Sequence, residues 1–125
     1  MTIPSVAVDL DELARALRLS WDAETSSDPS WAASVPSQGQ CAVSALVVQD
    51  EFGGDLIRAV VQGVSHYWNR LPNGSEVDVT RDQFDHWCPI DEAVRDRAYV
   101  LSYPDTAARY ALLRSRVHDR LRVRS

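Results

Sequence analysis

Lysine is absent from this chain of 125 residues, so all 13 of its basic residues are arginines. This absence excludes chemistry that needs a lysine amine, such as a Schiff base or the lysine of a phosphate-binding P-loop. Cysteine is scarce, because the chain has only Cys41 and Cys88. Two cysteines in a chain without a secretory pattern do not predict a disulfide framework. Each is therefore a candidate core residue, metal ligand or nucleophile.

Long apolar runs are also lacking. The longest apolar stretch, residues 42–48, is far shorter than the roughly 20 residues that a membrane-spanning helix needs. The N-terminal segment has no basic region and turns acidic at Asp9, which is not the pattern of a secretory signal. We therefore expect a cytoplasmic protein without a membrane partner.

The composition is that of an ordinary globular protein, with 45% hydrophobic and 25% charged residues. A chain of this length has room for one domain, so we expect residues 1–125 to fold as a single domain. The charge is uneven, because the segment from Arg95 to Ser125 holds eight arginines and three aspartates within a chain of net charge −5. Since the chain as a whole is acidic, we expect a solvated helix here and no nucleic-acid partner.

The spacing of hydrophobic residues and the turn signals predict the order of the elements. We expect helices over residues 8–20, 41–52 and 104–120, and strands over residues 55–63, 65–71, 75–80 and 99–103. Residues 21–40 form a long loop rich in Ser and Pro, and residues 81–87 a turn or short helix. Residues 88–91 are expected to begin a helical or irregular stretch. Periodicity alone leaves residues 41–52 open between buried helix and buried strand, but their length and the following Gly53 favour a helix.

The segment Leu-Pro-Asn-Gly between two strand-like runs predicts a hairpin. Its turn at residues 72–74 suits a three-residue loop that ends in a left-handed glycine. That register pairs Asn69 with Val77 and puts His66 and Asp78 on the same face, as diagonal neighbours within reach. A two-residue loop would put Asp78 on the opposite face.

Three reactive side chains follow in order: Cys41 at the start of a buried helix, His66 in the hairpin and Asp78 on its returning strand. A helix N-terminus and a nearby histidine both lower the pKa of a thiol and so favour the nucleophilic thiolate. A third residue must then hold the imidazole in the correct tautomer. These three residues are therefore candidates for a catalytic triad.

An acyl-transfer nucleophile also needs hydrogen-bond donors for the oxyanion. The backbone N–H groups at the helix start supply one donor, and the amide of either Gln38 or Gln40 is a candidate for the second. Trp68 shares the face of His66 and is placed to form a wall of the site. Its neighbour Asn69 is a further candidate for substrate binding.

Two segments of this central region resemble the YunG family of small bacterial proteins. They are SQGQCAVSALVVQDEFGG, from Ser37, and SHYWNRLPNGSEVDVTRDQF, which ends at Phe84. More distantly, Gln-Gly-x-Cys at the start of a buried helix, followed by His and Asp on successive strands, is similar to papain-like cysteine peptidases. The similarity implies Cys41 as nucleophile, His66 as base and Asp78 as the residue that orients it. It also implies an α+β fold with a papain-like core, in which a buried helix packs on a small antiparallel sheet with helices on either side.

The expected function is that of a thiol-dependent hydrolase or acyltransferase that acts on an amide, ester or thioester of a small molecule or peptide. Amide hydrolysis, deamidation and acyl transfer all use the same triad, and none of them needs a cofactor. A chain of this length leaves little room for a substrate cleft. We therefore expect a very small substrate, or a second copy of the chain or another partner chain that completes the site.

Two alternatives stay open. One is a non-catalytic protein that binds a small molecule or peptide in the same cleft. The other is a zinc site built from Cys41, His66, His86 and Cys88. The spacing His-x-Cys is not a usual ligand pair, so we expect no metal and interpret Cys88 as a packed residue near Pro89.

Overall fold

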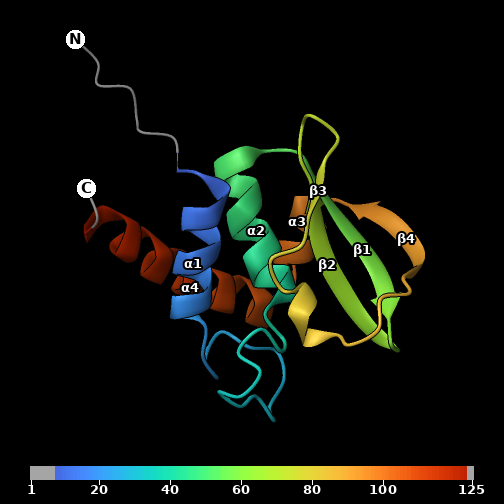
Figure 1. Ribbon diagram of the computed structural model, residues 1–125, viewed down its shortest axis with the longest axis horizontal. Coiled ribbons are helices and arrows are strands. Elements are labelled where there is room, and N and C mark those ends of the chain that lie inside the picture. Colours follow the sequence, from blue (N-terminus) through green and yellow to red (C-terminus); the bar gives the residue numbers. More distant parts are fainter. Residues whose placement is uncertain (1–7, 124–125) are drawn as a thin grey trace.

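The computed structural model describes residues 8–123, and Figure 1 shows its helices gathered on one side of a sheet. The helices are α1 (Leu10–Ser20), α2 (Cys41–Phe52), η1 (Arg81–Gln83, a 3₁₀ turn), α3 (Arg97–Leu101) and α4 (Pro104–Val123). The strands are β1 (Asp55–Val61), β2 (Val64–Arg70), β3 (Glu76–Val77) and β4 (Ile90–Arg95). The sheet is antiparallel in the order β3-β2-β1-β4. The expected α+β architecture is confirmed.

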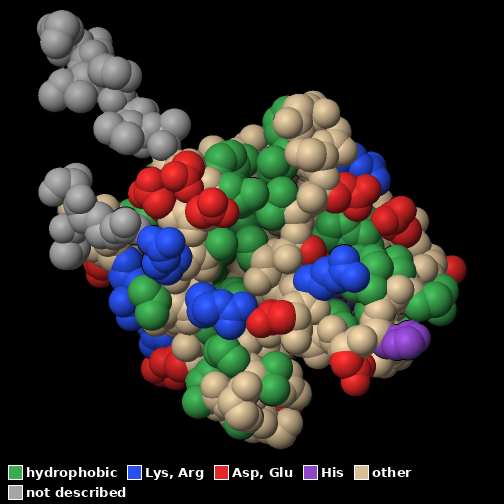
Figure 2. All heavy atoms as spheres, viewed as in Figure 1, with side chains coloured by type: hydrophobic (Ala, Val, Ile, Leu, Met, Phe, Trp, Pro, Cys, Tyr) green, Lys and Arg blue, Asp and Glu red, His purple; other side chains and the backbone are tan. Residues whose placement is uncertain are grey.

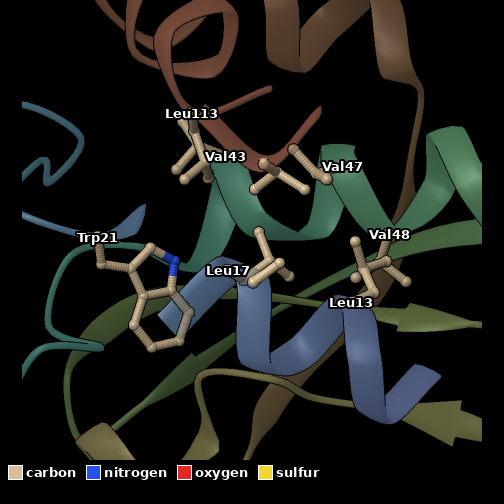
Figure 3. Close-up of a cluster of buried hydrophobic side chains, with 9 residues drawn as sticks. Leu13, Leu17, Trp21, Val43, Val47, Val48 and Leu113 are labelled. Carbon is tan, nitrogen blue, oxygen red and sulfur yellow. The ribbon is translucent and has the colours of Figure 1, made fainter. Parts of the chain in front are cut away.

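Helix α2 lies between the other long helices and the sheet (Figure 1). Its residues 43–48 are all buried, which is the pattern of a helix that must be covered on every side. One side packs against α1 and α4, as Figure 3 shows for Leu13 and Leu17 of α1 and Leu113 of α4. The other side contacts the sheet, because Leu46 packs against Leu56 of β1. The predicted helix over residues 41–52 is confirmed.

Helix α1 is capped at its start and tied to this core at its end. Asp9 caps its start by accepting a hydrogen bond from the Glu12 backbone N–H at 2.9 Å. At its end, Trp21 is buried in the same core, and its indole Nε1 donates to the Ser44 hydroxyl of α2 at 2.9 Å. Trp21, the first residue of the long loop, therefore anchors that loop to the core.

Two hairpins join the central strands. Strand β1 ends at Val61 and not at the predicted Gly63, because Gln62 and Gly63 have φ of 49° and 74° and form a tight two-residue turn. In the second hairpin Asn69 pairs with Val77, and the Leu71 N–H donates to the Ser75 carbonyl at 2.8 Å. The predicted three-residue loop and its register are confirmed.

The returning strand of this hairpin is shorter than predicted. It was expected over residues 75–80, but β3 contains only Glu76 and Val77. The reason lies in Asp78, whose Oδ1 accepts hydrogen bonds from the Thr80 N–H at 3.2 Å and from its hydroxyl at 3.3 Å. An aspartate that bonds the backbone two residues on bends the chain into a turn, which ends the ladder.

Two predictions for the later part of the chain are wrong. Residues 88–91 lead into strand β4, which pairs with β1, and not into a helical or irregular stretch. Strand β4 is mostly exposed at the sheet edge, so it lacks the apolar alternation that marks a strand. Residues 99–103 do not form a strand, since α3 covers Arg97–Leu101. There the packing of Val100 against the cluster around Leu46 overrides the strand preference of Tyr and Val.

The arginines of α4 are not simply solvated, which corrects another expectation. Arg116 donates to the Ser20 carbonyl at 3.0 Å and forms ion pairs with Asp22 and Glu24, both at 3.0 Å. Arg120 donates to the Leu19 carbonyl at 2.9 Å. These bonds satisfy carbonyls at the C-terminal end of α1. Figure 2 shows basic and acidic side chains side by side over this pair of helices.

No helix among residues 8–123 combines the length and the apolar character that crossing a membrane would require.

The burial of α2 predicts a large difference between two leucine substitutions in helices. Leu46 is 0% exposed and Leu19 of α1 is 59% exposed. We expect Leu46→Ala to lower the free energy of unfolding by about 2–5 kcal/mol, because it removes buried methyl groups and leaves a cavity. The matched control Leu19→Ala should change it by less than about 0.5 kcal/mol. Urea denaturation followed by tryptophan fluorescence measures both, and equal losses would contradict the central place of α2.

Candidate active site

Cys41 is the first residue of α2 and lies at the rim of the core. No side chain of the described residues caps this helix start, where Gln40 occupies the N-cap position. The first N–H groups of a helix have no partner within the helix, so the backbone here can donate to a ligand. The Cys41 thiol is partly buried, and its Sγ lies 3.9 Å from the Ser65 carbonyl oxygen of β2. The structure thus places the thiol against the strand that carries His66.

His66 is fully buried and hydrogen-bonded to Asp78. Its Nε2 lies 2.6 Å from Asp78 Oδ2, in agreement with the diagonal neighbours predicted from the hairpin register. The second carboxylate oxygen of Asp78 accepts the two bonds from Thr80 described above. A carboxylate held on both oxygens orients the ring, so the other nitrogen, Nδ1, is the one left for chemistry.

Three aromatic rings surround the imidazole. Between ring centroids, Phe84 lies 4.7 Å from the imidazole and nearly perpendicular to it, and Trp87 lies 5.7 Å away. Trp68 stacks on the imidazole at 5.8 Å with an interplanar angle of 27°. This apolar shell covers the imidazole, which is fully buried. In such surroundings a charged hydrogen bond is stronger than it is in water.

The environment raises the pKa of His66 from 6.5 to about 9. Burial acts in the opposite direction, but the hydrogen bond that His66 donates to Asp78, and then the hydrogen bonding and negative charge of Cys41, outweigh it. Nδ1 has no partner of ordinary hydrogen-bond geometry among the described residues. With this pKa, His66 is protonated at neutral pH.

An open pocket of about 650 Å³ lies in front of Cys41. One wall is the loop before α2, which contributes Asp28 and Gln38, and the opposite wall is the turn between β1 and β2 together with Phe84. Phe84 therefore contacts His66 and also lines the pocket. A volume of this size is typical of small-molecule sites.

The loop wall is held by contacts that only glycine permits at position 39. Gly39 has φ of 74°, and a Cβ there would lie 2.3 Å from the Ser26 hydroxyl oxygen and 2.8 Å from the Asp28 nitrogen. This close approach lets the Ser26 hydroxyl donate to the Gln38 carbonyl at 2.8 Å. The loop is thereby fixed against the residues that precede Cys41.

The structure separates the two glutamine candidates. Gln38 lines the pocket, and its amide Nε2 donates to the Asp28 carboxylate at 2.5 Å. Gln40 is buried and turned away, because its Nε2 donates to the Asp22 carbonyl at 3.0 Å. Of the alternatives left open by the sequence, Gln38 is thus the one brought to Cys41.

The other two candidates do not line this pocket. Trp68 is buried beside His66, and its Nε1 donates to Glu76 Oε1 at 2.6 Å. It therefore packs on the histidine as expected, but from behind the pocket. Asn69 points to the opposite face of the sheet, where its Nδ2 donates to the Ala45 carbonyl of α2 at 2.9 Å. Its amide is thus committed to the contact between helix and sheet.

The second cysteine is exposed and not packed, which corrects the expectation for Cys88. His86 beside it is exposed as well. Among residues 8–123 no group of three or more His, Cys, Asp and Glu side chains is arranged to hold a metal ion.

Sequence reasoning missed two residues of this site. Asp28 holds Gln38, and Phe84 joins His66 to the pocket. The hydrogen bond between Gln38 and Asp28 joins two parts of an irregular loop, so no sequence pattern predicts it. Phe84 could have been found, because it is an apolar residue in the polar run that directly follows the hairpin.

The fold and the site define an α+β protein in which a thiol at a helix start meets a buried His–Asp pair beside a pocket. The family described as "YunG protein" matches residues 9–122. The chain belongs to this family. The "Uncharacterized protein YunG" of Bacillus subtilis (strain 168) is 43% identical to it over 68 residues.

The match to the Bacillus subtilis protein covers 54% of this chain and 56% of that relative, so the similarity spans about half of each. A search of solved structures finds none that matches.

The raised pKa predicts how stability depends on pH. Protonated His66 stabilises the folded state fully below its unfolded pKa of 6.5, and this contribution is lost as the pH rises toward about 9. The shift corresponds to about 3 kcal/mol. We expect the free energy of unfolding of the wild type to fall by about this amount between pH 6.5 and 9.5. His66→Gln should flatten that slope, as measured by urea denaturation at each pH. An unchanged slope in the variant would show that His66 is not the group responsible.

Proposed function

We propose that the protein is a thiol-dependent hydrolase or acyltransferase with a papain-like arrangement of Cys41, His66 and Asp78. One observation carries the proposal. The buried imidazole is hydrogen-bonded to Asp78 through Nε2 at 2.6 Å, while the Cys41 thiol, at the start of α2 and at the edge of an open pocket, lies 3.9 Å from the carbonyl oxygen of the neighbouring Ser65. Nucleophile, base and orienting carboxylate in this order are the parts that covalent acyl transfer needs.

The first step forms a thioester. With a pKa of about 9 for His66, the reactive state pairs a Cys41 thiolate with a His66 imidazolium. The thiolate attacks the carbonyl carbon of an amide, ester or thioester, and a C–S bond forms. As the bond to the leaving group breaks, His66 gives its proton to the departing nitrogen, oxygen or sulfur. Asp78 keeps the ring in place throughout.

The negative charge on the carbonyl oxygen requires donors in this step. The uncapped start of α2 supplies backbone N–H groups, that of Cys41 among them. Gln38 supplies the second donor, because its amide carries two N–H bonds and only one is given to Asp28. Asp28 would then act as the residue that positions this amide.

The second step releases the acyl group. Now neutral, His66 takes a proton from the incoming nucleophile, which attacks the thioester carbon, and the Cys41 thiolate leaves. A water molecule gives hydrolysis, and an amine or alcohol gives acyl transfer. The pocket of about 650 Å³ favours a small molecule or the end of a peptide over a cleft completed by a second chain.

The two cysteines allow a sharp test of this proposal. Cys88 is exposed and Cys41 is partly buried, so access alone would make Cys88 the faster thiol. We expect the reverse at pH 6, where iodoacetamide should alkylate Cys41 at least about tenfold faster because only the thiolate reacts. Single-thiol variants Cys88→Ser and Cys41→Ser, followed by mass spectrometry, measure the two rates separately.

Further variants separate an enzyme from a binding protein. Asp78→Asn and His66→Gln should slow the alkylation of Cys41 and leave that of Cys88 unchanged. With p-nitrophenyl acetate, the wild type should release p-nitrophenol in a burst and gain one acetyl group on Cys41. If Cys41 reacts no faster than Cys88 and no acetyl group is found, the protein is a non-catalytic binder and the enzyme proposal fails.

A further inference from the structure

A second pocket, of about 330 Å³, lies beside the first on the α2 side of the sheet. Its walls come from the sheet, from α3 and from the start of α4. The polar side chains that line it are those of Arg58, Ser65, Tyr67, Arg95, Tyr99 and Tyr103, with Thr106 at the α4 end. No carboxylate lines it. The polar side chains of the pocket therefore present positive charge and hydroxyl groups, beside the apolar Ala42 and Val100.

The strand register explains why two arginines meet here. Arg58 of β1 lies opposite Ala93 of β4, and Arg95 lies opposite Leu56. Arg58 and Arg95 are thus diagonal neighbours on the same face of the sheet. Arg58 also lies opposite Tyr67 of β2, which brings that hydroxyl group onto the same face.

These two guanidinium groups have no carboxylate partner among residues 8–123. Arg58 Nε donates to the Ser65 hydroxyl at 2.9 Å, and Arg95 has no side-chain bond to a described residue. Arg109 of α4 donates to the Thr106 hydroxyl at the pocket wall, at 3.3 Å. The Nε atom of Arg109 is buried and has no hydrogen-bond partner among residues 8–123. By contrast, Arg97 is paired with Asp50 at 2.7 Å. Positive charges gathered on one face without a counter-ion favour a bound anion.

The hydroxyl groups complete a set of donors. Burial raises the pKa of Tyr67, so its phenol stays protonated and can donate. The hydroxyl oxygens of Tyr99 and Tyr103 lie 3.1 Å apart at the mouth of the pocket. Planar guanidinium groups with neutral hydroxyl donors match the two oxygens of a carboxylate.

We propose that this pocket binds the carboxylate of a small organic acid. Ser65 lines both pockets, and Ala42, the residue after Cys41, lines the second one. The two pockets therefore adjoin at Ser65. Resting on the proposed function, we take the acyl donor or acceptor of Cys41 to be a molecule with a free carboxylate.

Calorimetric titration at low salt tests the pocket with succinate and benzoate as probes, and with inorganic phosphate and neutral succinamide as comparisons. We expect the wild type to bind at least one of the two acids, and Arg58→Gln and Arg95→Gln to weaken that binding tenfold or more. Arg15→Gln, an exposed arginine of α1 with the same change in charge, should leave it unchanged. Cys41→Ser should also bind normally, so this result is independent of thiol chemistry.

Two outcomes overturn the proposal: neither acid binds, whether or not phosphate or succinamide does, or Arg15→Gln weakens binding as much as Arg95→Gln. Arg95→Lys and Tyr103→Phe, with folding checked by circular dichroism, cover the case in which a glutamine variant fails to fold. Arg95→Lys should lose affinity although the charge stays, because lysine cannot bind a carboxylate through a planar pair of donors. If acid binding persists while Cys41 proves unreactive, the pocket stands and only the enzyme proposal fails.

Discussion

The burial of α2 on all sides is the constraint on which the rest of the structure depends. A helix with buried side chains along residues 43–48 is stable only inside other elements, so α1 and α4 must cover one side and the sheet the other. The same requirement decides where the reactive thiol lies. The chain enters this helix from a loop that is exposed over residues 32–35 and half-buried or buried over residues 36–40, so its first residue, Cys41, is left at the border between core and solvent.

A buried histidine in an aromatic shell is stable only with a partner for its polar atoms. The hairpin supplies that partner within the same supersecondary unit, because the turn that ends β3 also fixes the carboxylate of Asp78. The same turn thus ends the strand and places the negative charge beside His66. Burial lowers the pKa of His66, but the Asp78 carboxylate and the Cys41 thiol outweigh it and raise the pKa to about 9.

The sequence predicts the elements that carry strong local signals. Helix 41–52 and the register of the second hairpin follow from an apolar run, from Gly53 and from the turn at residues 72–74, and the contact between His66 and Asp78 follows from that register. Strand β4 and helix α3 could not be predicted, because pairing with β1 and packing of Val100 decide them. The orientation of Gln40 depends on a backbone carbonyl 18 residues away, which no local pattern encodes.

The contact between α1 and α4 has a consequence for synthesis of the chain. The apolar side of the first helix packs on Leu113 and Val117, and its last carbonyls are bonded by Arg116 and Arg120. All four of these residues leave the ribosome about a hundred residues after the helix that they cover. Until α4 has emerged, α1 has only its contacts with α2, so the domain closes only after α4 is made. A chaperone that holds apolar segments of nascent chains would therefore find the side of α1 that faces α4 exposed until that point.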